Sequence, residues 1–186
     1  MSLSLTGGRF NGAILKTPTG ASLTRPTSGK VRQALFNVLR GRFEDRDFLD
    51  LYAGSGAVGF EAVSRGARRA VLVENHPVAC KILEANRALL VQRGADGDTL
   101  RAVRRDARAF CEDPGAEFPR ASFAVVFADP PFGQDFTGLW DAMRPLLEPG
   151  GTGLVQFPAR RPPDFAARAD RILEYGESAI ALFRPE

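Results

Sequence analysis

Short apolar runs alternate with longer stretches of helical periodicity from about residue 47 to residue 157. The apolar runs have the length and composition of buried strands. They cover residues 48–51, 70–74, 99–103, 123–128 and 153–157. The stretches of helical periodicity cover residues 58–65, 77–92, 107–112 and 136–147. Strands that alternate with helices form a parallel sheet covered on both faces, so this pattern predicts an α/β fold of the Rossmann-like type.

Two further β-like stretches follow near the carboxyl terminus, at residues 171–175 and 179–183. The separation around Gly176 is too short for a helical crossover, so the two strands must run antiparallel to each other. We therefore expect a mostly parallel, seven-stranded sheet whose last two strands form an antiparallel hairpin at one edge.

The chain ahead of the sheet predicts a small extension with its own elements. Gly7-Gly8 and Asn11-Gly12 are turn dipeptides between short apolar stretches, which is typical of a hairpin. Ser28 is a candidate N-cap for a helix over residues 29–39. The polar side of that helix is expected to carry Lys30 and Arg32.

Charge is distributed unevenly between this extension and the rest of the chain. The whole chain of 186 residues carries a formal charge of +3. The first 43 residues contain seven basic residues and no acidic one, which leaves −4 for the remainder. The seven are Arg9, Lys16, Arg25, Lys30, Arg32, Arg40 and Arg42. Such asymmetry indicates an anionic partner such as nucleic acid, although a solvated surface segment is an equal alternative. We expect a basic extension at residues 1–43 and a separate domain at residues 44–186.

Composition narrows the class of protein further. With 44% hydrophobic and 25% charged residues, the chain has the make-up of an ordinary globular protein. Cys80 and Cys111 lack metal-ligand spacing and fit free thiols better than a disulfide framework. No segment has the length and apolarity of a membrane span or a signal peptide. We expect a cytoplasmic monomer that uses neither metal nor membrane.

A glycine loop directly after the first long strand predicts a nucleoside site. Gly54, Gly56 and Gly59 satisfy G-x-G-x-x-G, and Glu74 ends the next strand, where a carboxylate can accept hydrogen bonds from ribose hydroxyls. The expected cofactor-binding residues are Asp50, Tyr52, Ala53, Gly54, Ser55, Gly56, Glu74, Asn75, Asp106 and Ala107. A tight turn without ligand is the alternative.

The charge of Asp50 favours one cofactor class over another. A dinucleotide places its pyrophosphate at such a loop, and a carboxylate in the same strand end would repel it. S-adenosylmethionine carries cationic groups that the carboxylate attracts. Asp106 is expected either to accept from the adenine amino group, to cap the helix that starts at Ala107, or to do both.

The segment Asp129-Pro130-Pro131-Phe132 follows the fourth long strand and predicts the catalytic centre. The prolines fix the backbone and remove two N–H donors. We expect Asp129 and the Pro130 carbonyl to accept hydrogen bonds from an exocyclic amino group, with Phe132 as a stacking surface for a base. The alternative is a strand-terminating turn with a buried phenylalanine.

Several motifs in order make the chain similar to the RsmD family of bacterial 16S ribosomal RNA guanine-N2 methyltransferases. The matching segments lie at residues 25–27, 31–37, 49–56, 61–67 and 129–132. The resemblance implies a class I methyltransferase fold, S-adenosylmethionine bound around Asp50, Gly54, Gly56, Glu74 and Asp106, catalysis at residues 129–132 and RNA contacts from the N-terminal extension. Two positions differ from the family pattern, since Gln156 replaces a glutamate and Asn11 an arginine of several relatives.

The expected activity is methyl transfer from S-adenosylmethionine to the exocyclic N2 of a guanine in 16S ribosomal RNA of a small-subunit particle. The resemblance implies guanine 966, with Arg9, Lys16, Arg25, Lys30 and Arg32 as RNA contacts. Three alternatives stay open: an amino methyltransferase acting on adenine or cytosine, a nicotinamide-dependent oxidoreductase, and an RNA-binding protein without catalysis.

Overall fold

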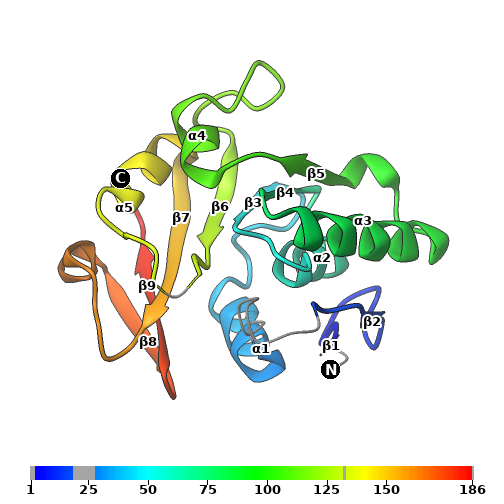
Figure 1. Cartoon of the computed structure of the whole chain (residues 1–186), viewed down its shortest axis with the longest axis horizontal. Coiled ribbons are helices and arrows are strands. Elements are labelled where there is room, and N and C mark those ends of the chain that lie inside the picture. The colour runs from blue at the N-terminus through cyan, green and yellow to red at the C-terminus, as the bar shows by residue number, and fades with distance from the viewer. Residues whose placement is uncertain (1–2, 19–27, 132, 186) are drawn as a thin grey trace.

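A seven-stranded sheet crosses the middle of the molecule in the computed structural model, which describes residues 3–18, 28–131 and 133–185 (Figure 1). Its strand order is β5-β4-β3-β6-β7-β9-β8. The strands are β3 (Asp47–Leu51), β4 (Arg69–Glu74), β5 (Leu100–Arg104), β6 (Phe123–Ala128), β7 (Leu147–Pro158), β8 (Arg171–Tyr175) and β9 (Ser178–Phe183). Strands β3 to β7 pair in parallel, whereas β9 runs antiparallel to β7 and β8 antiparallel to β9. The predicted fold class is confirmed.

Helices cover both faces of this sheet, as a parallel sheet requires. They are α1 (Gly29–Val38), α2 (Ala57–Ser64), α3 (Pro77–Gln92), α4 (Ala107–Glu112) and α5 (Leu139–Met143). Figure 1 shows α4 and α5 together on one side and α1, α2 and α3 on the other. The core divides accordingly: α4 and α5 pack on side chains such as Val71 and Val126, and the other three helices pack on Leu72, Phe127 and their neighbours.

Most predicted elements match the observed ones to within one or two residues, but two do not. The helix predicted at residues 136–147 is an α-helix only over α5, with a 3-10 turn at Arg144–Leu146. Gly138, at a φ of 68°, precedes its first turn, and the ring of Pro145 is incompatible with a continuing α-helix. Strand β7 starts six residues earlier than predicted, because Leu147 already pairs with Phe123 of β6. The register then shifts before Val125 pairs with Thr152, and residues 148–151 lie between these pairs as a bulge.

The N-terminal extension packs onto the same core as the sheet. Strands β1 (Leu3–Ser4) and β2 (Ile14–Leu15) form the predicted antiparallel hairpin. Leu5, Phe10 and Leu15 of this segment are buried against α2, α3 and β4. Ser28 caps α1 as predicted, with its Oγ accepting from the N–H of Val31 at 3.3 Å. The extension is therefore built into the fold rather than attached to it.

Arg32 is a correction to the sequence analysis. It was expected on the exposed side of α1, but its side chain is fully buried and donates from Nε to Oε2 of Glu61 at 3.0 Å. It also donates from Nη2 to the carbonyl of Ser4 at 2.6 Å. A buried guanidinium requires a buried carboxylate partner, and Glu61 of α2 is 29 residues away, beyond the reach of a periodicity argument. Arg32 joins the hairpin, α1 and α2, and is not available for RNA.

No helix within residues 3–18, 28–131 and 133–185 is both long enough and apolar enough to cross a membrane.

Candidate active site

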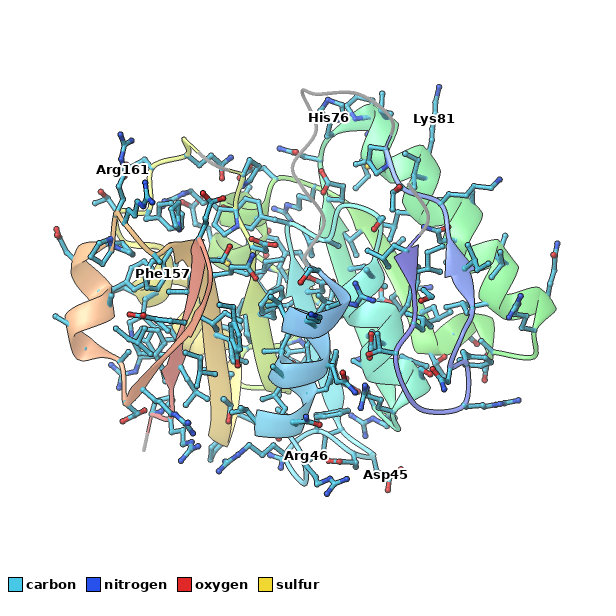
Figure 2. All side chains as sticks on the ribbon, turned by 90° about the horizontal axis from the view of Figure 1, so that it is seen from below. Asp45, Arg46, His76, Lys81, Phe157 and Arg161 are labelled. Carbon is cyan, nitrogen blue, oxygen red and sulfur yellow. The ribbon has the colours of Figure 1, made fainter. Side chains whose placement is uncertain are left out.

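The two edges of the parallel sheet can be followed by the residues that flank its strands. Figure 2 shows His76, which follows β4, and Arg161, which follows β7, at one edge of the molecule, with Asp45 and Arg46 ahead of β3 at the opposite edge. Ligands of open α/β sheets bind at the carboxyl ends of the strands. The residues that end or directly follow β4, β5 and β6, namely Glu74, Asp106 and Asp129, all lie at that edge.

The glycine loop connects β3 to α2 and has the backbone geometry of a ligand-binding turn. Tyr52, Gly54 and Gly56 adopt positive φ values of 63°, 57° and 82°. A Cβ at Gly56 would come within 2.4 Å of Phe60 and 2.5 Å of Leu83, so this glycine allows α2 and α3 to pack closely. A Cβ at Gly54 would meet only the Tyr52 carbonyl, at 4.0 Å. Open space on this side of Gly54 is what a bound nucleoside needs.

Glu74 is fixed beside this loop by backbone donors. Its Oε2 accepts from the N–H of Gly54 at 2.8 Å. Its Oε1 accepts from the N–H groups of Asn75 at 2.9 Å and His76 at 2.7 Å. These bonds leave lone pairs on both oxygens. The structure thus holds this carboxylate at the end of β4 against the glycine loop, and its role toward ribose hydroxyls stays a prediction.

Asp50 is more deeply placed than the sequence suggests. It is 2% exposed, and its Oδ2 accepts from the N–H of Gly59 in the first turn of α2 at 2.9 Å. Burial raises the pKa of Asp50 to about 8; the bond from Gly59 opposes this rise, and the charges of Asp129 and Glu74 add to it. Within the described residues no cation pairs with it. At neutral pH the free carboxyl of Asp50 therefore holds its proton, and a cationic ligand at this edge would favour the ionised carboxylate and lower that pKa.

Asp106 combines two features of the predicted site. Its Oδ1 accepts from the N–H groups of Arg108 at 2.9 Å and Ala109 at 3.1 Å, so the expected N-cap of α4 is confirmed. Its Oδ2 accepts from Nδ2 of Asn75 at 3.3 Å, which connects the ends of β4 and β5. A role toward adenine stays a prediction.

The segment predicted to be catalytic leaves the sheet next to β3, the strand of Asp50. Asp129 follows β6, and its N–H points to the Leu51 carbonyl at 3.5 Å. Pro130 is buried and Pro131 half-buried, and Phe132 lies outside the described residues. Arg108 fixes the chain just beyond, donating to the carbonyls of Asp135 at 2.7 Å and Thr137 at 2.9 Å.

Two buried amide side chains border the site, of which sequence reasoning missed Asn86 and noted Gln156 only as a departure from the family pattern. Asn86 of α3 donates to the Ser55 carbonyl of the glycine loop at 2.9 Å and exchanges hydrogen bonds with the backbone of Lys16. Gln156 near the end of β7 is 6% exposed, and its Oε1 has no hydrogen-bond partner. Amides inside otherwise apolar patterns were the available signal, but their partners cannot be read from a pattern.

The basic residues expected to contact RNA lie in different surroundings. Lys16 and Lys30 are exposed, the former next to the glycine loop through Asn86. Arg9 is exposed, donates to the Gly94 carbonyl at 2.9 Å and lies 5.1 Å over the ring of Phe10. Arg25 falls outside the described residues.

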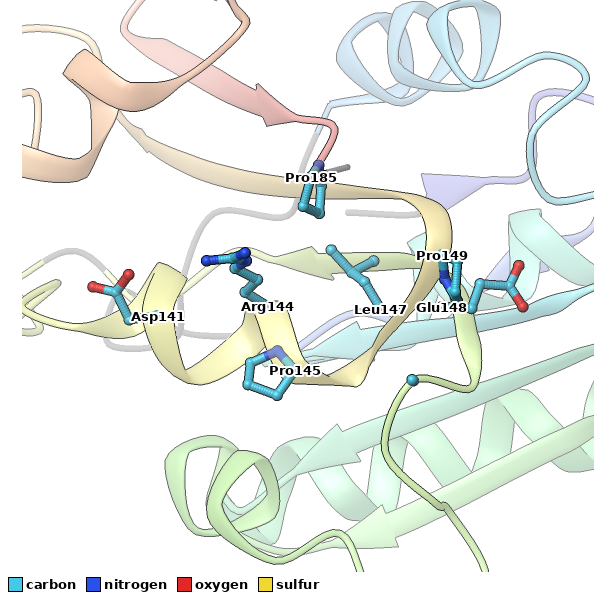
Figure 3. A pocket seen from close by; sticks show the side chains of 8 residues that line it. Asp141, Arg144, Pro145, Leu147, Glu148, Pro149 and Pro185 are labelled. Atoms are coloured by element: carbon cyan, nitrogen blue, oxygen red, sulfur yellow. The ribbon is translucent and has the colours of Figure 1, made fainter.

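A pocket of about 400 Å³ lies elsewhere, at the amino end of β7 (Figure 3). Arg144, Pro145, Leu147, Pro149 and Pro185 are among its lining residues. None of the acids at the carboxyl edge lines it, so it plays no part in the candidate active site.

Comparison with known proteins decides the family. The family described as conserved hypothetical protein 95 matches residues 3–183. Ribosomal RNA small subunit methyltransferase D of Escherichia coli is 36% identical over 149 residues, which is 80% of this chain and 68% of that protein. This chain belongs to the RsmD family.

Solved structures share the fold over nearly the whole chain. A hypothetical protein of Thermus thermophilus is 34% identical with a TM-score of 0.82, covering 98% of this chain and 99% of that one. The T. thermophilus 16S rRNA N2 G1207 methyltransferase, RsmC, in complex with AdoMet and guanosine, is 20% identical with a TM-score of 0.70. The match covers 100% of this chain and 50% of RsmC, and at this identity it shows the class I methyltransferase fold alone.

Proposed function

We propose that this protein transfers a methyl group from S-adenosylmethionine to the exocyclic N2 of a guanine in 16S ribosomal RNA, with guanine 966 as the expected position. The observation that carries the proposal is the row of acids at the carboxyl edge, Asp106, Glu74, Asp50 and Asp129, on the adjacent strands β5, β4, β3 and β6. The small-subunit rRNA methyltransferases of the same family support the RNA class of substrate.

The residues at this edge fit S-adenosylmethionine. Glu74 offers a carboxylate for the ribose, the open side of Gly54 admits the nucleoside, and buried Asp50 supplies negative charge near the sulfonium and ammonium groups. An anionic pyrophosphate would meet the same charges unfavourably. RsmC, which has the same fold, binds AdoMet. When bound, S-adenosylmethionine supplies the methyl group, and its sulfur keeps the electron pair of the broken bond.

The chemistry assigned to this chain is orientation and deprotonation of the amine. Asp129 and the Pro130 carbonyl accept from the two N–H bonds of the exocyclic amine, which turns its lone pair toward the methyl carbon. The proton that the amine loses passes to Asp129. Pro130 and Pro131 keep the acceptors in place because their φ angles are fixed. Phe132 provides the stacking surface for the base.

The basic extension is proposed to hold the RNA. Lys16 lies beside the glycine loop, and Lys30 lies in the first turn of α1. These two lysines put positive charge near the acidic catalytic edge, where the phosphate backbone of a substrate would run. Arg9 lies toward the opposite edge, where it bonds Ser64 and Gly94 at the carboxyl ends of α2 and α3, and is proposed as a more distant phosphate contact. Arg25, outside the described residues, is proposed as a contact from its charge alone. Residues 1–43 thus have a binding task and residues 44–186 a catalytic one.

Methyl transfer with a labelled donor tests the proposal. Small-subunit particles and naked 16S RNA are incubated with the enzyme, digested to nucleosides and separated by mass. Label in N2-methylguanine is expected, and mapping then gives the nucleotide. Label in adenine or cytosine, or none in either substrate, overturns the proposal. Titration with S-adenosylhomocysteine against NADH separates it from an oxidoreductase.

A further inference from the structure

Gln156 is a buried amide whose oxygen lacks a hydrogen-bond partner, at the edge where the acids lie. It is 6% exposed, and its Oε1 is shielded from water and accepts from no group of residues 3–18, 28–131 and 133–185. Buried polar side-chain atoms almost always have a partner, because an unmade hydrogen bond costs free energy. An acceptor left in this condition beside a catalytic segment indicates that its donor comes from outside the chain.

The sheet places Gln156 directly beside Asp129. The parallel ladder of β6 and β7 pairs Ala128 with Val155, so Asp129 and Gln156 are the next two residues in register. Neighbouring strands are separated by about 4.8 Å. Gln156 pairs with Ile180 and lies two residues after Leu154, so its side chain is on the same face of the sheet as theirs. Leu154 and Ile180 belong to the core under α1. Asp129, two residues after Phe127 of the same core, continues this face.

The Watson–Crick edge of guanine has a donor pattern that fits this pair of residues. Its exocyclic N2 amine lies next to the N1–H, and both are donors. Bases taken out of a helix are recognised by hydrogen bonds to this edge. If Asp129 accepts from N2, an acceptor one strand further along the edge meets N1–H.

We infer that Gln156 is a base-recognition residue whose Oε1 accepts the N1–H of the target guanine while Asp129 holds the amine. This assignment rests on the proposed function. Because Oε1 is shielded in the structure, a base can reach it only after neighbouring side chains move. The hydrogen bond therefore forms when the base enters. Gln156 therefore contributes to the choice of guanine rather than to cofactor binding.

Thr152 provides a matched control on the same strand. Its Oγ1 is also buried without a partner, and it lies on the same face of β7, four residues nearer the amino end. Replacing an unpartnered polar atom by an apolar group of similar shape is neutral or stabilising. Gln156→Leu and Thr152→Val should therefore both keep the thermal stability of the wild type, and both should keep its affinity for S-adenosylhomocysteine.

The experiment compares RNA substrates that carry guanine or 2,6-diaminopurine at the nucleotide that the wild type methylates. Diaminopurine keeps the 2-amino group but has an acceptor at N1. Gln156→Leu should lower kcat/KM on guanine by about 10- to 100-fold, whereas Thr152→Val should leave it unchanged. Gln156→Glu keeps an acceptor and should retain more activity than Gln156→Leu. It should also prefer guanine more strongly than the wild type does, because an amide can turn to donate to N1 of diaminopurine and a carboxylate cannot.

Three results would overturn the assignment while leaving the proposed function intact. They are wild-type kcat/KM for Gln156→Leu, no advantage of Gln156→Glu over Gln156→Leu, and an unchanged preference between the two bases for Gln156→Glu. A wild-type enzyme that labels no guanine N2 instead overturns the proposed function, and this assignment with it.

Discussion

The two edges of the parallel sheet hold their acidic side chains in different ways. At the amino edge, Asp47 accepts from Nε of Arg68 at 2.9 Å and from Nε of Arg69 at 3.1 Å, and Glu148 pairs with Arg46. At the carboxyl edge, Asp50 and Glu74 accept from backbone N–H groups, and neither forms an ion pair with a described residue. Arginines pair with the acids at one edge, whereas Asp50 and Glu74 have no such partner among the described residues at the other. The first arrangement stabilises the fold, and the second is the one that the proposed cationic ligand would use.

The largest effect that would sharpen this comparison is expected at Asp129. Asp129→Ala removes the acceptor for the amine and should lower kcat by about 10²- to 10⁴-fold. Affinity for S-adenosylhomocysteine, measured by calorimetry, should stay at the wild-type value. Equal losses of turnover and cofactor affinity would instead assign Asp129 to the cofactor-binding site.

Asp47 and Asp50 offer a direct test, because they are two buried acids of the same strand at its opposite ends. Asp47→Ala breaks charged hydrogen bonds to two arginines and should lower the free energy of unfolding by about 1–3 kcal/mol. Urea denaturation measures this change, and cofactor affinity serves as the control and should not change. Asp50→Asn should have the opposite profile, with stability maintained and affinity for S-adenosylmethionine reduced. The same profile for both variants would contradict the distinction between the edges.

The pH dependence of cofactor affinity tests the charge of Asp50. Since the pKa of Asp50 is raised to about 8, the free carboxyl holds its proton below that pH. A sulfonium favours the carboxylate, so binding releases a proton, and affinity for S-adenosylmethionine should rise by up to about tenfold per pH unit as pH approaches 8. S-adenosylhomocysteine, which lacks the sulfonium, should show a weaker rise. Asp50→Asn should flatten both curves, and a steep curve retained in this variant would assign the titration to another group.

The smallest effect is expected at the basic extension. Lys30→Ala should reduce the slope of log Kd for RNA against log salt by about one, because one phosphate contact is lost. Arg93, an exposed residue after the last turn of α3, is the matched control. Fluorescence anisotropy at several salt concentrations measures both. Equal changes in this slope for Lys30→Ala and Arg93→Ala would show that the extension contacts RNA no more than another basic surface residue does.

Local patterns predicted the parts of the fold that depend on local chemistry. The bounds of α3, α4, β6 and β8 match the predicted ones because apolar spacing and capping residues define them. The glycine loop and its acids were found for the same reason, since each follows a strand. The contacts of Asn86, the burial of Gln156 and the partner of Arg32 could not be predicted, because each depends on residues brought together only by the sheet and helix packing. Gly138 and Pro145 are both recognisable in the sequence as residues that interrupt a helix, but the apolar spacing over residues 136–147 predicted one continuous helix, which is wrong.

The burial of Arg32 against Glu61 bears on how the chain can be divided. Glu61 also accepts from Arg65 at 2.7 Å, but Arg65 retains 20% of its side-chain exposure, whereas Arg32 and Glu61 have none. A fragment beginning at residue 44 would keep Glu61 and lose the guanidinium that neutralises it inside the protein. The basic extension and the sheet therefore form one folding unit, and truncation ahead of residue 44 would leave Glu61 as a buried charge that has lost its fully buried partner.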